Sequence, residues 1–264
     1  MIPSAPFPVL DLRAAVAKKP LQLDGVDLLP ADDLARARDH WRVHMAAEFA
    51  SARVFSGLVP QLMAAGIDYE DVRDVVEMAK QEVDHGLLSG RVLAALGGDP
   101  ISAIPPLDPV PLHEGCSPLE VVLRNVISVS CCGETLAVAE IGAERERATM
   151  EPLRAILTMI LADEVGHARF GWKLLRDLAP AMDAELKRRL SAYLVAIFER
   201  DLISMKGALA APTASWAALT VGAPDGELAW TTFIETVTSV TVPGLERFGL
   251  KAGWALEKAR ERVG

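Results

Sequence analysis

The fold is decided by two short stretches of the sequence, EVDH at residues 82–85 and EVGH at residues 164–167. Each places a glutamate and a histidine three residues apart, which puts both side chains on one face of a helix. The helical spacing of apolar residues around each stretch indicates that it lies near the middle of a long helix. A buried carboxylate is costly unless it is paired or bound to metal. The repeated pattern therefore predicts that both stretches contribute to one metal site.

A third helix can supply a carboxylate to the second motif. With a turn near Thr149, Glu164 and Glu134 lie equally far along the chain from the turn, one on each side of it. Equal distance from the turn means equal height in an antiparallel helical hairpin, so Glu134 is the predicted ligand. Glu140 is the competitor, but it would lie about 9 Å along the helix axis from that height. Glu140 is therefore expected on the surface.

The same reasoning selects a carboxylate for the first motif. With a turn near Gly66, Glu82 and Glu48 lie at nearly equal distances along the chain on its two sides, Glu48 being slightly farther away. The two distances agree within the uncertainty of helix ends read from sequence. Glu48 is therefore the predicted fourth carboxylate.

Helical spacing, capping residues and the positions of proline and glycine predict a chain of helices with no trusted strand. Asp68 is a predicted N-cap, and Ser117 opens a capping box followed by Pro118. Pro243 is expected to separate the last two helices. The expected helices cover residues 31–58, 68–97, 117–148, 152–178, 183–211, 227–240 and 244–262.

Two proline-rich segments interrupt this pattern. Residues 1–30 are expected to form an irregular arm on the domain. Residues 99–116 lack a helical period, and a loop of this length needs a reason. A crossover along a bundle supplies one, because such a segment, when extended, can span up to roughly 60 Å, more than a helix of about 40 Å.

Composition narrows the function classes. The formal net charge of −9 argues against a nucleic-acid partner, which would need a basic surface. The apolar runs are too short for a membrane span, and the N-terminus lacks the pattern of a secretory signal. The cysteines, at positions 116, 131 and 132, are odd in number, which favours reduced thiols in a cytoplasmic protein.

The combined pattern resembles the ligand set of the ferritin-like di-iron carboxylate superfamily, an all-α class. In that arrangement two helices each give one Glu and two others each give Glu-x-x-His. The resemblance covers roughly residues 31–178 and implies a four-helix bundle with a long crossover, inside one domain of residues 31–264. Accessory helices would occupy residues 183–262. The ligands that it implies are Glu48, Glu82, His85, Glu134, Glu164 and His167.

The resemblance also implies cofactors and partners. Two iron ions, cycling between Fe2+ and Fe3+, would occupy the site, with manganese in one or both positions as an alternative. Dioxygen, a small-molecule substrate and an external electron donor would be the partners. The segment from Glu227 onward would either cover the bundle or form a homodimer contact.

Three further residues are candidates for catalysis. Asp163 resembles the oxygenase form of the motif, in which the residue before the Glu orients a ligand histidine, here His85, through a hydrogen bond. His44 lies one turn before Glu48, and it is either a third imidazole ligand or proton relay, or a hydrogen-bonded polar residue. Cys131 is either a small buried apolar residue or part of a pocket wall or thiol relay.

Three functions are compatible with this pattern. The favoured one is an oxygenase or oxidase that activates dioxygen to oxidise a small, partly apolar organic molecule, because the additional helices can wall a pocket. The expected pocket wall includes Phe55, Ile127, Cys131 and Phe170. The alternative is a ferroxidase, peroxidase or iron-storage protein. The third is a non-catalytic helical interaction protein in which the ligand set is accidental.

Overall fold

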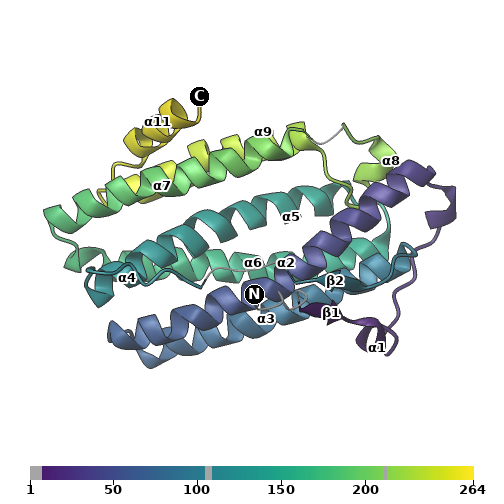
Figure 1. Cartoon of the computed structure of the whole chain (residues 1–264), viewed down its shortest axis with the longest axis horizontal. Coiled ribbons are helices and arrows are strands. Elements are labelled where there is room, and N and C mark those ends of the chain that lie inside the picture. The colour runs from purple at the N-terminus through teal and green to yellow at the C-terminus, as the bar shows by residue number, and fades with distance from the viewer. Residues whose placement is uncertain (1–7, 105–108, 211–212) are drawn as a thin grey trace, which may run out of the picture.

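A computed structural model describes residues 8–104, 109–210 and 213–264. Long helices lie side by side along the molecule in Figure 1, so the expectation of an all-α protein is confirmed. Two hairpins, residues 31–95 and 118–178, form the part of the bundle that carries both motifs. The helices that follow, including α7 and α9, lie along the upper side of the molecule in Figure 1.

The first hairpin joins α2 (Ala31–Ala64) to α3 (Tyr69–Ala95). Gly66 makes the turn with a φ of 69°, a left-handed conformation that favours glycine. The Asp68 side chain caps α3 by accepting a hydrogen bond from the Asp71 backbone N–H at 3.0 Å. The predicted turn and cap are both confirmed, and α2 extends beyond its expected end through Pro60.

The second hairpin joins a long bent helix to α6 (Glu151–Leu178). The long helix consists of α4 (Pro118–Val126), a π-helical segment η2 (Ile127–Glu134) and α5 (Thr135–Arg147). Ser117 caps its start by accepting from the Glu120 N–H at 3.3 Å, as predicted. The π-helical segment was not predicted, because apolar spacing does not report the hydrogen-bond register of the backbone.

The chain continues from α6 through a short 3-10 turn, η3 (Ala179–Ala181), into α7 (Ala184–Ala208) and α8 (Trp216–Leu219). The next helix consists of α9 (Gly226–Thr236), the π-helical η4 (Val237–Thr241) and α10 (Val242–Glu246). The expected break at Pro243 is wrong. The π-helical turns before Pro243 loosen the hydrogen-bond ladder, which accommodates a residue without a backbone N–H. The break follows Glu246, before α11 (Ala252–Val263).

The segment from Glu227 onward covers the bundle in this chain. Helix α9 packs against α5 and α7, and α11 packs against α7. Apolar side chains of these helices share a core with Leu123, Ile127, Cys131 and Cys132 of the long helix. This layer therefore supports the long helix.

The two proline-rich segments contain more structure than expected. Strand β1 (Val9–Asp11) pairs antiparallel with β2 (Ile101–Ala103), and the arm also forms α1 (Arg13–Val16) and the 3-10 turn η1 (Val26–Leu28). The expectation of no strand was therefore wrong at this place. No alternation was visible in the sequence because each strand has only three residues. Part of the arm, residues 1–7, and part of the crossover, residues 105–108, lie outside the described residues.

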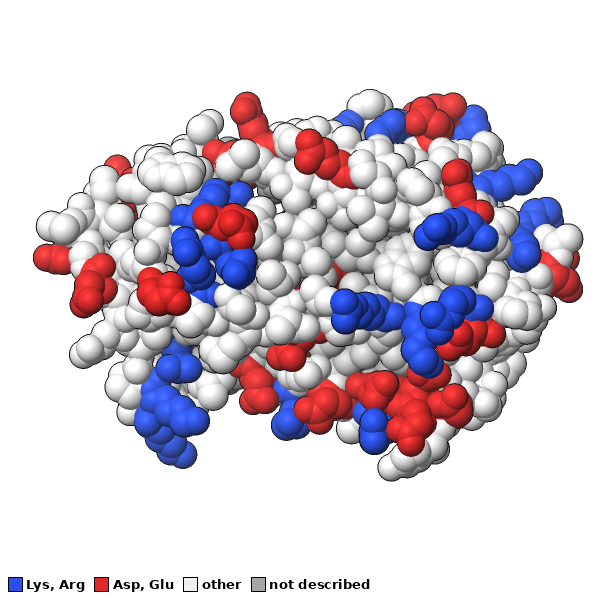
Figure 2. Space-filling model, turned by 180° about the vertical axis from the view of Figure 1, so that it is seen from behind, with Lys and Arg blue, Asp and Glu red and all other residues white. Residues whose placement is uncertain are grey.

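The surface carries both signs of charge. On the face seen in Figure 2, Lys and Arg are interspersed with Asp and Glu, and acidic groups gather along the lower edge. One helix, Pro118–Arg147, is long and apolar enough to cross a membrane by length and composition. About half of its apolar window (56%) is buried inside the protein, and the core helix of a soluble protein meets the same criterion.

Candidate metal centre

Six side chains meet midway along the two hairpins. Helix α3 supplies Glu82 and His85, and α6 supplies Glu164 and His167, each pair from one helix face. Glu48 comes from α2, and Glu134 is the last residue of the π-helical segment. The structure thus brings together every side chain that the sequence predicts as a metal ligand.

These side chains form two overlapping groups, in each of which four ligand atoms lie within 4.8 Å of one another. Glu82 and Glu164 belong to both groups, as carboxylates that bridge two ions would. Glu140 belongs to neither of the two groups. The groups are Glu48, Glu82, His85 and Glu164, and Glu82, Glu134, Glu164 and His167.

The nitrogen and oxygen atoms at the centre are arranged as metal ligands would be, rather than as hydrogen-bond partners of one another. His85 Nδ1 lies 3.2 Å from a Glu164 oxygen, and His167 Nδ1 lies 3.1 Å from a Glu82 oxygen. Neither nitrogen makes a well-oriented hydrogen bond, and Glu164 Oε2 also has no partner. All three atoms are shielded from solvent. Unpartnered buried polar atoms need an explanation, and two ions among four carboxylates and two imidazoles would supply it.

On the ring side away from the carboxylates, each motif histidine is hydrogen-bonded to a residue of the other motif helix. His85 Nε2 donates a hydrogen bond to Asp163 Oδ2 at 3.1 Å, and His167 Nε2 donates to Gln81 Oε1 at 2.9 Å. Gln81 Nε2 also donates a hydrogen bond to Asp163 Oδ1 at 3.1 Å. This bond links the two side chains that hold the imidazoles. Because carboxylate and amide oxygens only accept hydrogen bonds, Nε2 of each imidazole carries its proton toward Asp163 or Gln81. The Nδ1 atoms then face the carboxylates of the centre. The ring orientation that metal binding through Nδ1 requires is therefore already selected.

Burial and mutual charge shift the pKa values of the group strongly. Burial raises the pKa of Glu82 to about 8, and burial also raises that of Glu134 well above its usual range. Burial disfavours the imidazolium of His85, but the carboxylates of Glu164 and Glu48 outweigh burial and raise its pKa to about 11. The pKa of His167 likewise rises to about 12 beside Glu134 and Glu164. The metal-free site therefore holds protons where a cation would otherwise neutralise the carboxylates.

His44 lies next to the centre and outside both ligand groups. Its Nε2 is 3.2 Å from Glu48 Oε1, and its Nδ1 is 3.1 Å from Ser89 Oγ. His44 therefore contacts the predicted ligand Glu48 and is not itself a member of either ligand group. The role of His44 as a relay stays a prediction.

Cys131, within η2, is completely buried in the apolar core. Burial raises the pKa of its thiol well above the ordinary value, which keeps the sulfur protonated. Of the other expected pocket-wall residues, Phe55 lies with its ring centroid 5.1 Å from that of His167. Phe170 lines an open groove between α3 and α6, and Ile127 packs in the same core as Cys131.

Two features of the site were not predicted as functional. Gln81 directly precedes Glu82 as Asp163 precedes Glu164, so its position in the repeated motif was the available signal. The second feature is a polar cavity of about 150 Å³ between α2, α5 and α9. Its lining includes His40, Glu140 and Glu144, so Glu140 is not the plain surface residue that was expected. No spacing in the sequence reports this cavity, because α9 is distant along the chain.

Comparison with protein-family models, with curated proteins and with solved structures found no match. The chain is therefore defined by its fold and site: an all-helical protein with buried Glu and His groups that could hold metal ions.

Proposed function

We propose that this chain is a ferritin-like di-iron oxygenase or oxidase that uses dioxygen to oxidise a small organic molecule. The observation that carries the proposal is the pair of ligand groups that share Glu82 and Glu164. A mixed set of carboxylates and imidazoles suits iron, and manganese is the alternative occupant. Two such ions, when bound, would supply the reduction of dioxygen with electrons from an external donor.

The protein's own residues would fix the geometry of this chemistry. Asp163 and Gln81 hold the two imidazoles in one orientation, so neither ring has to turn when a metal binds. The ring of Phe55 lies against His167, and Phe55 is completely buried. Such apolar packing excludes water from one side of the centre. His44 hydrogen-bonds Ser89 and contacts Glu48, where a proton can be held next to a ligand carboxylate.

The oxidation of an organic molecule is favoured over iron storage by the helices after α6. These helices pack as an additional layer against the long helix. An iron-storage protein or a minimal peroxidase does not need such a layer. Two apolar side chains lie beside His167: the ring of Phe55 packs against it, and Phe170 lines the same groove as His167. We therefore propose a partly apolar substrate, such as an amine, an amino-acid derivative or a fatty compound.

Oxygen consumption tests this function. Protein loaded anaerobically with two ferrous equivalents would be mixed with aerobic buffer alone and with each class of candidate substrate. We expect one class to accelerate oxygen consumption and to be recovered in oxidised form, and Glu134→Gln protein to show neither effect. Identical oxygen consumption with every class, together with continued oxidation of added ferrous iron, would contradict the proposal and support a ferroxidase.

A further inference from the structure

The polar cavity between α2, α5 and α9 contains buried polar atoms that make no hydrogen bond. His40 Nε2, Glu144 Oε2 and Arg147 Nε are shielded from solvent and have no hydrogen-bond partner among the described residues. All three side chains line the same cavity of about 150 Å³, together with Glu140 and His44. Buried polar atoms normally find partners, so this cavity is built to hold something polar.

The charges in the cavity favour a cation. Burial and, to a smaller extent, the charge of neighbouring Glu144 raise the pKa of Glu140 to about 7. The pKa of Glu144 itself is lowered despite burial, mainly by His40. Asp225, at the cavity wall, also has a lowered pKa because backbone N–H groups donate to it. Arg147 provides the only counter-charge of a Lys or Arg among the lining residues that the structure describes.

Two histidines of α2 extend from the cavity wall toward the metal centre. The rings of His40 and His44 lie 5.7 Å apart on successive turns of α2, and His44 Nε2 lies 3.2 Å from Glu48 Oε1. His40 Nε2 lies 3.5 Å from Glu144 Oε1 across the cavity. These imidazole and carboxylate groups are the ligand types that divalent iron, cobalt and manganese accept.

On the opposite side of the centre, the described residues form an open groove in which the polar side chains next to the histidines already have partners. The groove between α3 and α6 reaches His167, but the polar atoms of Gln81 and Asp163 there are already hydrogen-bonded to the two histidines and to each other. A cation passing on that side would have to break the hydrogen bonds that orient both imidazoles. Glu82 and His85 are nearly inaccessible, at 2% and 0% exposed, so an ion needs a defined route to reach them.

We infer that the polar cavity is the uptake site through which divalent cations reach the metal centre, with His40, Glu140 and Glu144 binding the ion in transit and His44 passing it to Glu48. This inference rests on the proposed metal centre. It assigns His40, Glu140 and Glu144 a role in the rate of metal loading and none in the final metal content.

The experiment measures the rate of Co2+ uptake by metal-free, full-length protein, followed by the visible absorbance of bound cobalt. A cleft of one charge sign raises on-rates by 10-fold or more, so we expect Glu144→Gln and His40→Ala to slow uptake at least about tenfold. Both variants should still bind two Co2+ at the end. Arg147→Gln should have the opposite effect and accelerate uptake, which a loss of folding would not produce.

The matched controls are Glu146→Gln and Asp39→Asn. Glu146 lies two residues from Glu144, but its side chain is 76% exposed against 15% for Glu144. Asp39 is next to His40, and its side chain is also 76% exposed. Both controls should load at the wild-type rate. Wild-type rates in Glu144→Gln and His40→Ala would overturn the inference, as would a reduced final cobalt content. Wild-type protein that takes up no cobalt would instead contradict the proposed metal centre.

Discussion

Glu134 decides whether one of the two ion positions exists. It is the only ligand from the long helix, and its oxygens belong to the group that contains His167. Replacing Glu134 with Gln keeps the shape but removes the charge, so we expect one of two bound metals to be lost. Glu146→Gln on the same helix removes an exposed charge and should leave the metal content unchanged. Elemental analysis after dialysis measures both, and two metals retained in Glu134→Gln would show that another residue is the ligand.

Gln81 is expected to tune metal affinity without touching the metal. It accepts a hydrogen bond from His167 and donates one to Asp163, and loss of such a partner typically weakens metal binding by about 10–100-fold. Gln81→Leu should therefore bind Co2+ more weakly by this factor while it remains folded. Glu77→Gln, one turn earlier and exposed, is the control. Equal affinities in competition titrations of the two variants would refute this role for Gln81.

Proton release should accompany metal binding. At pH 7 the metal-free centre holds protons on His85, His167 and Glu82, whose pKa values are raised to about 11, 12 and 8. A bound cation displaces these protons, so affinity should rise with pH. Above pH 8 Glu82 is already ionised, so the release per site should then fall. Calorimetry of Co2+ binding in buffers of different ionisation enthalpy measures the release, and an affinity independent of pH between 6 and 8 would contradict it.

At the scale of single elements, the π-helical segment η2 determines where Glu134 lies. The segment packs closely on α6 at Gly171, where an added Cβ would lie 3.0 Å from the Ser130 carbonyl carbon and 3.1 Å from the Cys131 nitrogen. Neither backbone atom can move without shifting the helix. Irregular π-helical turns are frequent at functional sites, and this one ends at a predicted ligand.

Gly171→Ala should therefore destabilise the protein. Overpacking of this kind costs about 1–3 kcal/mol, whereas Gly166→Ala, on the same helix with nothing within 4 Å of the added Cβ, should be neutral or stabilising by up to about 1 kcal/mol. Urea unfolding of the metal-free proteins gives both values. Equal stability of the two variants would show that α6 can move away from η2 freely.

At the scale of the whole molecule, the sequence was sufficient to predict the helices and the meeting of the ligands. Hairpin symmetry explains this success, because Glu134 and Glu164 lie equally far from a turn that exists. Hydrogen-bond register was not predictable, so η2 and the continuation of the last long helix past Pro243 were missed. The polar cavity was missed because it forms only when α9 packs against α5.

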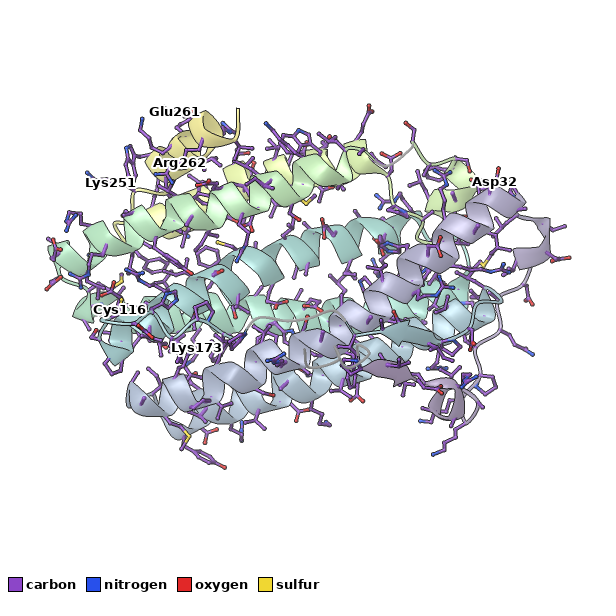
Figure 3. The ribbon with its side chains drawn as sticks, viewed as in Figure 1. Asp32, Cys116, Lys173, Lys251, Glu261 and Arg262 are labelled. Carbon is purple, nitrogen blue, oxygen red and sulfur yellow. The ribbon has the colours of Figure 1, made fainter. Side chains whose placement is uncertain are left out.

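The layer of later helices contributes both to the polar cavity and to the support of the helix that carries Glu134. Helices α7 and α9 support the long helix, and residues at the start of α9 close the cavity that His40 and Glu144 line. Lys173, labelled in Figure 3, ties α6 to α3 through a 2.7 Å ion pair with Asp71 near one end of the motif helices. The motif helices are thus held together beyond the metal ligands themselves.

The most direct test of the account is the metal content of the purified protein, measured by elemental analysis before and after anaerobic loading with ferrous iron and removal of excess metal. The proposed function predicts two irons per chain after loading, because the carboxylates and imidazoles form two groups that could each hold a metal ion. Protein that is folded but holds no iron after this loading would contradict the account.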